Sequence, residues 1–433
     1  MKVIISSFIM TITLGLIEGG SHAFFYLKYG KPIPKKEIQN TLLPENISIQ
    51  TAEVEEPPPT LMKDHVLHPY LGYVRNHKKS KHIFDEKVVK VPVNSQGFFG
   101  LSPLEKKEKN EIHIALMGGS VATHLFLYSK ERLISALQQN ERFKNKKLKI
   151  ISLALGGMKQ PQQSLALNLF LVLGGKFDIV INLDGFNEIA LPYLENIPVN
   201  VYPFFPRFWH FYAAKAIDTD VAGLIGKGVL IKEDRERWRK YFSWGPLKHS
   251  AFFLTIWQSL NKQKQNELTK IHNQVKDFLK LRLKSPQQTG PKYIFNSPEK
   301  LFEDSAKVWE QSSFQMAKIS KSNGMQYFHF LQPNQYLRNS KVFTEEEKKT
   351  ALAGASQPFA EAVQTGYPLL RKAGESLKNS GVAFIDLTDI FKNETQTIYK
   401  DFCCHYNQFG NDILAEEIAK AINDYTSKNA HPL

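Results

Sequence analysis

The chain has 433 residues, enough for one large domain or two ordinary ones. Hydrophobic residues make up 42% and charged residues 23%, a globular composition that excludes a disordered protein. The formal net charge of +14 comes from scattered basic residues, and no helix-turn-helix, zinc-finger or RNP signature accompanies them. Nucleic acid is therefore not an expected partner. We interpret this charge as solvated surface, with attraction to an anionic membrane or an acidic glycan as the alternative.

The N-terminus has the composition of a targeting segment. An apolar run over residues 3–17 is interrupted by Glu18 and is shorter than the ~20 residues that a spanning helix needs. Residues 21–23 read Ser-His-Ala, which fits the small-x-small rule for signal cleavage, but apolar character resumes directly afterwards. We predict an uncleaved signal anchor over residues 1–27, which tethers an extracytoplasmic domain to the membrane. A cleaved signal peptide and a secreted protein are the alternative.

The rest of the chain divides by composition. Residues 28–64 are polar and contain E-E-P-P-P (55–59), which is typical of a linker with a stiff polyproline stretch. Short strands and turns are predicted at 65–103. We predict one folded domain over residues 65–425 and a C-terminal tail at 426–433.

Alternating short apolar runs and helical patterns predict the fold class. Five runs have the length and continuity of strands buried on both faces: 112–117, 149–155, 178–184, 326–331 and 383–387. Helical spacing of apolar residues occurs between and after them, at 130–143, 162–173 and 413–422. This alternation predicts an α/β protein with a parallel five-stranded sheet and helices on both faces.

A predicted helical insertion at residues 196–300 separates the third strand from the fourth. It begins with an aromatic segment, 200–212, and continues with helical periodicity over 258–284. The aromatic residues either pack the insertion onto the core or form a lid or an acyl- or sugar-binding wall.

Chemically suggestive residues follow the first three predicted strands. Ser120 ends M-G-G-S (117–120), Gly157 ends S-L-A-L-G-G (152–157), and Asn187 ends D-G-F-N (184–187). Ligands of open parallel sheets bind outside the carboxyl ends of the strands, so we expect these residues to lie close together.

The residue types match the needs of acyl transfer. Ser120 would be the nucleophile, and the Gly157 N–H and the Asn187 amide would donate to the oxyanion. His405, just before the last predicted helix in D-F-C-C-H (401–405), would be the general base, and Asp401 would orient its imidazole. The structural alternatives are a helix-entry glycine at 157 and a helix N-cap at Asn187. We interpret the acidic residues that flank Asn187, Asp184 and Glu188, as structural.

Cys403 and Cys404 are the only cysteines of the chain, and they are adjacent. This count excludes a disulfide framework and a four-thiolate zinc site. We interpret the pair as small apolar residues beside His405.

Together, these segments resemble the SGNH hydrolase superfamily, or GDSL-type esterases, over about residues 110–190 and 325–425. The resemblance assigns the nucleophile, the block-two glycine, the oxyanion asparagine and the catalytic histidine to Ser120, Gly157, Asn187 and His405. It implies a flavodoxin-like three-layer sandwich around a five-stranded parallel sheet. It also implies that no metal or organic cofactor takes part.

The sequence departs from the motifs of this superfamily at three positions. Gly119 replaces the aspartate of G-D-S, and Glu188 replaces the aspartate that follows the asparagine. Asp401 lies four residues before His405 where the D-x-x-H motif has three. The third departure leaves open a Ser–His dyad in which a backbone carbonyl orients His405.

The sequence thus predicts a serine ester hydrolase that forms an acyl-enzyme. The expected substrates are acylated small molecules or glycans, chiefly O-acyl groups of envelope or extracellular polysaccharide, a class that rests on the predicted location and on the resemblance. One alternative is an O-acyltransferase that uses the same residues with a sugar hydroxyl as acceptor. Another is a non-catalytic SGNH-like protein that binds glycans or serves in assembly.

Overall fold

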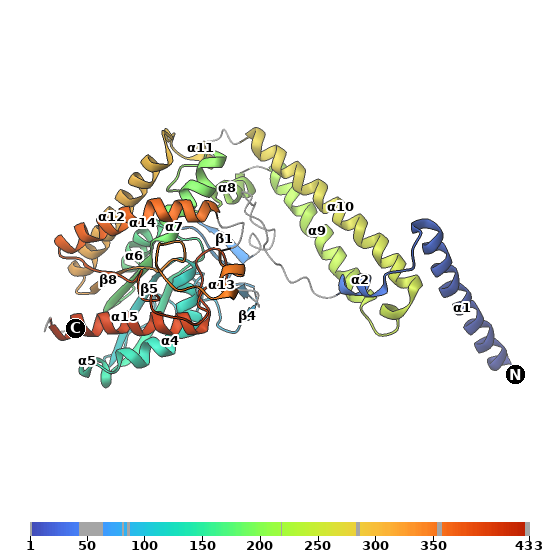
Figure 1. Ribbon diagram of the computed structural model, residues 1–433, viewed down its shortest axis with the longest axis horizontal. Helices are drawn as coiled ribbons and strands as arrows, with labels where there is room; N and C mark the ends of the chain where they lie inside the picture. The colour runs from blue at the N-terminus through green and yellow to red at the C-terminus, as the bar shows by residue number, and fades with distance from the viewer. Residues whose placement is uncertain are drawn as a thin grey trace. The chain divides into compact units, whose positions relative to one another are not determined.

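The computed structural model describes residues 2–42, 64–79, 82–84, 87–217, 219–282, 286–352 and 357–428. The chain divides into two compact units. Unit 1 comprises residues 1–49 and 214–282, and unit 2 comprises residues 50–213 and 283–433. Figure 1 shows the elements of both units.

Unit 2 is built on a five-stranded parallel sheet (Figure 1). Its strands are β5 (Glu111–Gly118), β6 (Lys147–Ala154), β7 (Ile179–Asp184), β8 (Gln326–Leu331) and β9 (Ala383–Asp386). Their order is β6-β5-β7-β8-β9, and every neighbouring pair is parallel. The predicted α/β class and all five predicted strands are confirmed, each strand within two residues of its expected bounds.

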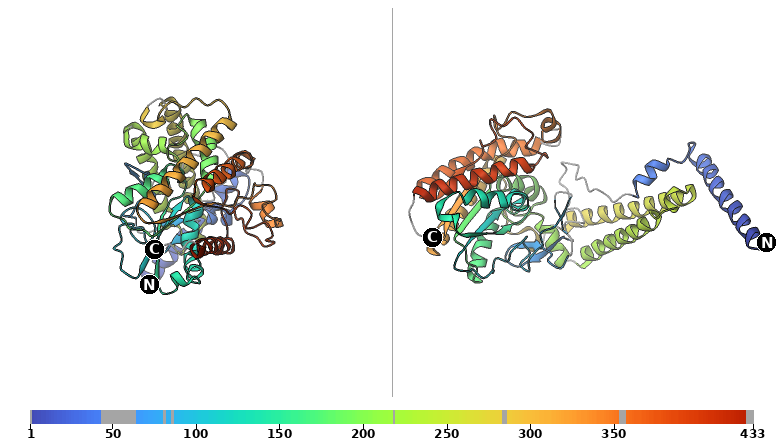
Figure 2. Two further views of the ribbon diagram at one scale, coloured as in Figure 1. Left: turned by 90° about the vertical axis from the view of Figure 1, so that its left-hand side faces the viewer. Right: turned by 90° about the horizontal axis from the view of Figure 1, so that it is seen from below.

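Helices cover both faces of this sheet (Figures 1 and 2). On one face, α4 (Ser120–Leu137) packs on β5 and β6, and α15 (Gln408–Lys428) lies beside α4. The other face carries α6 (Gln162–Val172), α12 (Pro298–Ser322) and α14 (Gln357–Asn379). Every residue of β5 and β7 is buried, which explains why these strands read as continuous apolar runs.

Smaller elements complete unit 2. The antiparallel pairs β1 (His65–His68) with β2 (Gly72–Arg75) and β3 (His82–Phe84) with β4 (Lys87–Val89) agree with the short strands expected at 65–103. The remaining α-helices among the described residues are α5 (Glu141–Lys144), α7 (Phe186–Leu191), α8 (Trp209–Ile217), α11 (Pro286–Thr289) and α13 (Glu345–Thr350). A π-helix, Pro192–Asn196, and a 3-10 helix, Ile197–Val199, follow α7. The boundary between the two units falls within α8.

The helix predicted at 130–143 has different bounds in the structure. It begins ten residues earlier, at Ser120, and ends at Leu137, before the separate short helix α5. Residues 121–126 are all buried, so the first turns of α4 show none of the apolar–polar alternation by which an amphipathic helix is recognised.

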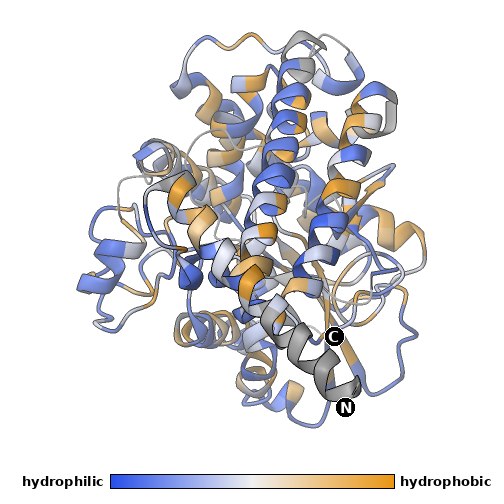
Figure 3. Ribbon diagram, turned by 90° about the vertical axis from the view of Figure 1, so that its right-hand side faces the viewer, coloured by the Kyte–Doolittle hydropathy of each residue, from blue (hydrophilic) through white to orange (hydrophobic). Residues whose placement is uncertain are grey.

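Unit 1 is a helical structure with its own small core. It contains α1 (Lys2–Tyr29), α2 (Lys35–Asn40), α9 (Thr219–Phe242) and α10 (Ala251–Arg282). Where the long helices are drawn in colour in Figure 3, hydrophilic and hydrophobic residues are interspersed along them. The core side chains are Phe25, Ile33, Ile38, Leu42, Phe242, Ala251, Leu254 and Trp257. The 214–282 part lies inside the insertion predicted at 196–300, and α2 lies inside the predicted linker; the E-E-P-P-P stretch falls outside the described residues.

Glu18, which interrupts the apolar N-terminal run, caps the first turn of α10. Its carboxylate accepts hydrogen bonds from the backbone N–H groups of Ala251 and Phe252 and from the Ser250 hydroxyl. The charged group that interrupts the apolar run therefore accepts hydrogen bonds from N–H groups at the start of α10, which have no partner within that helix.

Among the described residues, no helix is both long and apolar enough to cross a membrane.

In unit 2, the start of α13 fixes the segment that leads to His405. Glu347 accepts hydrogen bonds from the N–H groups of Ile398 (2.8 Å) and Tyr399 (3.0 Å) and pairs with Lys341 at 3.0 Å. The side chains of Glu347 and Lys341 are both fully buried. Burial raises the pKa of Glu347, and these partners together lower it below its ordinary value.

We expect Glu347→Gln to cost about 3–5 kcal/mol of stability, because it leaves the Lys341 ammonium buried without a counter-charge. Urea unfolding measures the loss. Glu345→Gln is the control, since Glu345 pairs with Lys348 at the exposed surface and its loss should cost less than about 1 kcal/mol. Equal, small losses for both variants would contradict a stabilising role for the buried pair.

Candidate active site

Ser120 is the first residue of α4, and only Gly119 separates it from the end of β5. Gly118 has a φ of 141°, and a β-carbon there would collide with the backbone oxygen of Leu183 on β7. Only glycine fits this position, and the chain turns at once from strand into helix. The half-buried Ser120 side chain thus lies at a helix N-terminus, where partial positive charge favours an anionic oxygen.

The structure brings Ser120, His405 and Asp401 into hydrogen-bond contact. His405 Nε2 lies 2.7 Å from Ser120 Oγ, and His405 Nδ1 lies 2.5 Å from Asp401 Oδ2. A carboxylate accepts hydrogen bonds, so the contact with Asp401 assigns the proton of a neutral His405 to Nδ1. Nε2 is then the acceptor for the Ser120 hydroxyl, as a general base requires.

The charge of Asp401 dominates the electrostatics of this group. Burial lowers the pKa of His405, but the Coulombic attraction and hydrogen bond of Asp401 outweigh burial and raise it to about 9. For Asp401 itself, burial raises the pKa, while His405 and backbone donors lower it to about 2. Asp401 is therefore ionised at neutral pH and stabilises an imidazolium at His405.

A tight turn compensates for the longer spacing between Asp401 and His405. Asp401 Oδ1 accepts hydrogen bonds from the backbone N–H groups of Cys403 (2.9 Å), Cys404 (3.2 Å) and His405 (3.3 Å). The chain between the two residues wraps around the carboxylate, and the second oxygen, Oδ2, reaches the imidazole. The acid that the spacing left in doubt thus contacts His405 directly.

Asn187 lies beside the turn that carries Ser120. Its Nδ2 donates a hydrogen bond to Met158 O (2.8 Å) and occupies the space where a β-carbon on Gly119 would be. A side chain at residue 119 would have to displace the Asn187 amide, so glycine at this position leaves the amide its place beside the serine turn. The N-cap of α7 is Gly185, so the alternative interpretation of Asn187 as a helix N-cap was wrong. An amide nitrogen carries two hydrogens, so Asn187 can donate one to Met158 and one to an oxyanion.

Gly157 lies in the turn after β6, with a φ of 76°. It precedes α6 by five residues, so it is not a helix-entry glycine. Met158 O, one residue further on, lies 3.3 Å from the position of a β-carbon on Gly119. The turns after β5, β6 and β7 therefore meet at one edge of the sheet.

The buried side chain of Glu188 links the turn after β6 to the turn after β7. Its carboxylate accepts hydrogen bonds from the N–H of Gln160 (3.0 Å), the Gln163 side chain (3.2 Å) and the N–H of Gly185 (2.9 Å). Burial first, and then the charge of Asp184, raises the pKa of Glu188 to about 8. These contacts agree with the structural role expected of Glu188.

His124 is a neighbour of the site that the sequence analysis missed. Its ring centroid lies 4.6 Å from that of His405, and the side chain is buried. Burial, followed by repulsion from His405, holds the pKa of His124 well below its ordinary value, so its ring is neutral. The sequence held one signal for this neighbour: His124 follows Ser120 by four residues, and residues four apart lie on the same face of a helix.

Arg207 was also missed. It comes from the aromatic segment 200–212, and its Cδ lies 2.5 Å from the position of a β-carbon on Gly157. Glu195 pairs with its guanidinium through two hydrogen bonds of 2.8 and 2.6 Å. Tyr212 of the same segment packs in the core of unit 2 against Tyr73. Tyr212 and Phe208 of this segment thus pack on the core. No local pattern could have shown that Arg207 reaches the turn after β6.

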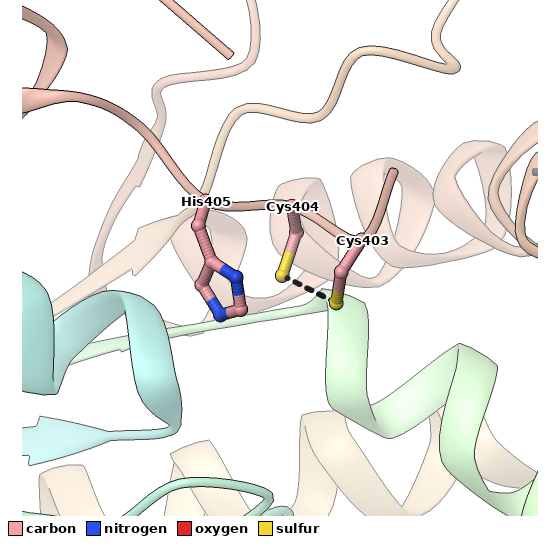
Figure 4. A group of neighbouring side chains, drawn as sticks. All are labelled: Cys403, Cys404 and His405. Carbon is pink, nitrogen blue, oxygen red and sulfur yellow. Dashed lines mark hydrogen bonds between the residues drawn. The ribbon is translucent and has the colours of Figure 1, made fainter. Parts of the chain in front are cut away.

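The two cysteines lie beside the catalytic candidates (Figure 4). Cys403 Sγ and Cys404 Sγ are 3.2 Å apart, and with one nitrogen of His405 they form a group within 4.8 Å. Such a spacing would suit a metal ion, but both nitrogens of His405 already have partners in Ser120 and Asp401. Metal binding would therefore compete with the catalytic arrangement.

Comparison of the sequence with protein-family models and with curated proteins found no match in either set.

We expect the His405 imidazole to titrate with a midpoint near pH 9, because the Asp401 carboxylate stabilises the protonated ring. Below this pH the ring is protonated and cannot accept the Ser120 proton, so the reactivity of Ser120 should rise as pH increases through 9. Removal of the carboxylate in Asp401→Asn should move the midpoint down. Proton NMR of the histidine ring measures both values, and an unchanged midpoint in the variant would contradict this electrostatic role.

Proposed function

We propose that this chain is an SGNH-like serine ester hydrolase that forms an acyl-enzyme on Ser120. The observation that carries the proposal is the contact chain from Ser120 Oγ through His405 to Asp401, with distances of 2.7 and 2.5 Å. The placement of Ser120 at the carboxyl edge of a parallel sheet adds support, since ligands of such sheets bind at that edge.

Each residue has a role in the proposed reaction. His405 Nε2 accepts the proton of the Ser120 hydroxyl as Oγ attacks the ester carbonyl. The Asn187 amide and the Gly157 N–H donate to the oxyanion of the tetrahedral intermediate. Collapse of the intermediate expels the alcohol, which takes the proton back from His405 and leaves an acyl group on Ser120. Water, activated by His405, then releases the carboxylic acid and restores the serine.

The proposed substrates are O-acyl groups of envelope or extracellular polysaccharide. This class rests on the resemblance and on the proposed location, in which residues 1–27 tether an extracytoplasmic domain to the membrane. A sugar hydroxyl in place of water would make the same residues an O-acyltransferase. Analysis of the products from an acetylated sugar, with and without a second sugar as acceptor, distinguishes the two reactions.

We expect a fluorophosphonate probe to label the protein and Ser120→Ala to abolish the labelling, because only an activated serine reacts with the probe. Ser313→Ala is the control, since Ser313 also hydrogen-bonds a histidine, at 2.7 Å, but is completely buried. Gel fluorescence measures labelling, and mass spectrometry identifies the modified residue. Labelling that persists in Ser120→Ala would refute the proposed nucleophile.

Asn187→Ala should lower kcat by about 10²–10³-fold and leave KM nearly unchanged, because the amide is proposed to stabilise charge that exists only in the transition state. Steady-state kinetics on an acetyl ester test this expectation, and a melting curve shows the cost of losing the bond to Met158 O. A lower melting temperature with unchanged kcat would leave Asn187 with a structural role alone.

A further inference from the structure

Cys403 and Cys404 differ in exposure but place their sulfur atoms together. The Sγ atoms lie 3.2 Å apart (Figure 4), although neighbouring side chains are free to diverge. Cys403 is half-buried, whereas Cys404 is buried. The pair therefore offers one thiol to a reagent from solvent and keeps a second thiol within reach behind it.

The backbone of the same pair holds the carboxylate of the candidate triad. The N–H groups of Cys403 and Cys404 both donate to Asp401 Oδ1, and Asp401 Oδ2 contacts His405. A covalent change that rotates the peptide between the two cysteines must also move a donor of Asp401. A bond between the two sulfur atoms would thus act on the orientation of His405 through the peptide and the Asp401 carboxylate.

We propose that Cys403 and Cys404 are a reversible modification site, which a low-molecular-weight disulfide oxidises to a vicinal disulfide that lowers the reactivity of Ser120. The effect on Ser120 rests on the proposed function, whereas the formation of the bond does not.

The chemistry proceeds by two exchange steps. Burial raises the pKa of the Cys404 thiol, so the first attack falls to the more exposed Cys403. Its thiolate attacks the external disulfide, forms a mixed disulfide and releases one thiol. Cys404 then attacks the sulfur of Cys403 and releases the second thiol. The two cysteines lose two electrons and two protons, and the external disulfide gains both.

The consequence for the site follows from covalent geometry. Adjacent Cα atoms are about 3.8 Å apart across a trans peptide, closer than the ~4.4–6.8 Å that disulfides usually bridge. Ring closure must also bring the sulfur atoms from 3.2 Å to about 2.05 Å within one small ring that includes the peptide between Cys403 and Cys404. The torsions on either side of this peptide must change, and the peptide carries the N–H that Cys404 donates to Asp401. Such a strained bond is readily reduced, so a thiol reductant should restore the starting state.

The experiment treats the full-length protein with oxidised glutathione. Intact mass and thiol titration report the bond, proton NMR follows the hydrogen-bonded His405–Asp401 proton, and fluorophosphonate labelling reports Ser120. We expect the loss of two hydrogen atoms, a shifted or lost NMR signal, and labelling slowed by at least about tenfold and at most by the ~10⁴-fold that loss of an orienting acid can cause. Dithiothreitol should reverse all changes.

Cys403→Ser is the matched control, because it keeps the backbone N–H that binds Asp401 but cannot form the bond. Glutathione treatment should leave its labelling rate and NMR signal unchanged. Addition of glutathione without ring closure would overturn the proposal, as would ring closure with an unchanged NMR signal, or equal inactivation of Cys403→Ser. If the untreated protein is not labelled, the proposed function fails instead. The mass and NMR measurements then still show whether the disulfide forms and whether it changes the contact between His405 and Asp401.

Discussion

Close approach of backbones at the end of β5 is the constraint on which the site depends. Gly118 pairs with Ala154 of β6 and Leu183 of β7, and a β-carbon at Gly118 would collide with the backbone oxygen of Leu183. A β-carbon at Gly119 would displace the Asn187 amide. The parallel register brings the turns after the three strands to one edge, and the missing side chains let the Asn187 amide lie beside the serine turn. The positions of the nucleophile and of its proposed oxyanion donor are thus set by the sheet.

A second serine–histidine–aspartate chain in the same unit shows that residue types and distances do not by themselves make a site. His329 contacts Ser313 at 2.7 Å and Asp184 at 2.8 Å, close to the distances around His405. All three side chains are within 2% of complete burial, so no substrate can reach them. Asp184 also accepts a hydrogen bond from Trp309, and this network fastens the end of β7, where the Asn187 turn begins. The difference in exposure separates a structural network from a candidate catalytic one.

The sequence predicted the sheet, and with it the meeting of the turns after β5, β6 and β7, because burial on both faces and strand ends leave local signals. It did not predict the start of α4, since the buried first turns of that helix lack periodicity. Nor did it predict Arg207 at the turn after β6, because that contact joins segments with no common pattern. Glu18 was recognised as a break in an apolar run, but its role as a cap of α10 depends on a partner more than 200 residues away.

The longer spacing from Asp401 to His405 illustrates how a turn can preserve a contact that a motif fixes by residue count. Three successive backbone N–H groups converge on one oxygen of Asp401, and the second oxygen is left for His405. The chain accommodates the extra residue by wrapping around the Asp401 carboxylate. The position of this carboxylate therefore depends on the conformation of Cys403 and Cys404. The backbone N–H groups of Cys403 and Cys404 thus serve the carboxylate, while the side chains of the same two residues carry the thiols. A change at the thiols would therefore act first on the N–H groups that hold Asp401.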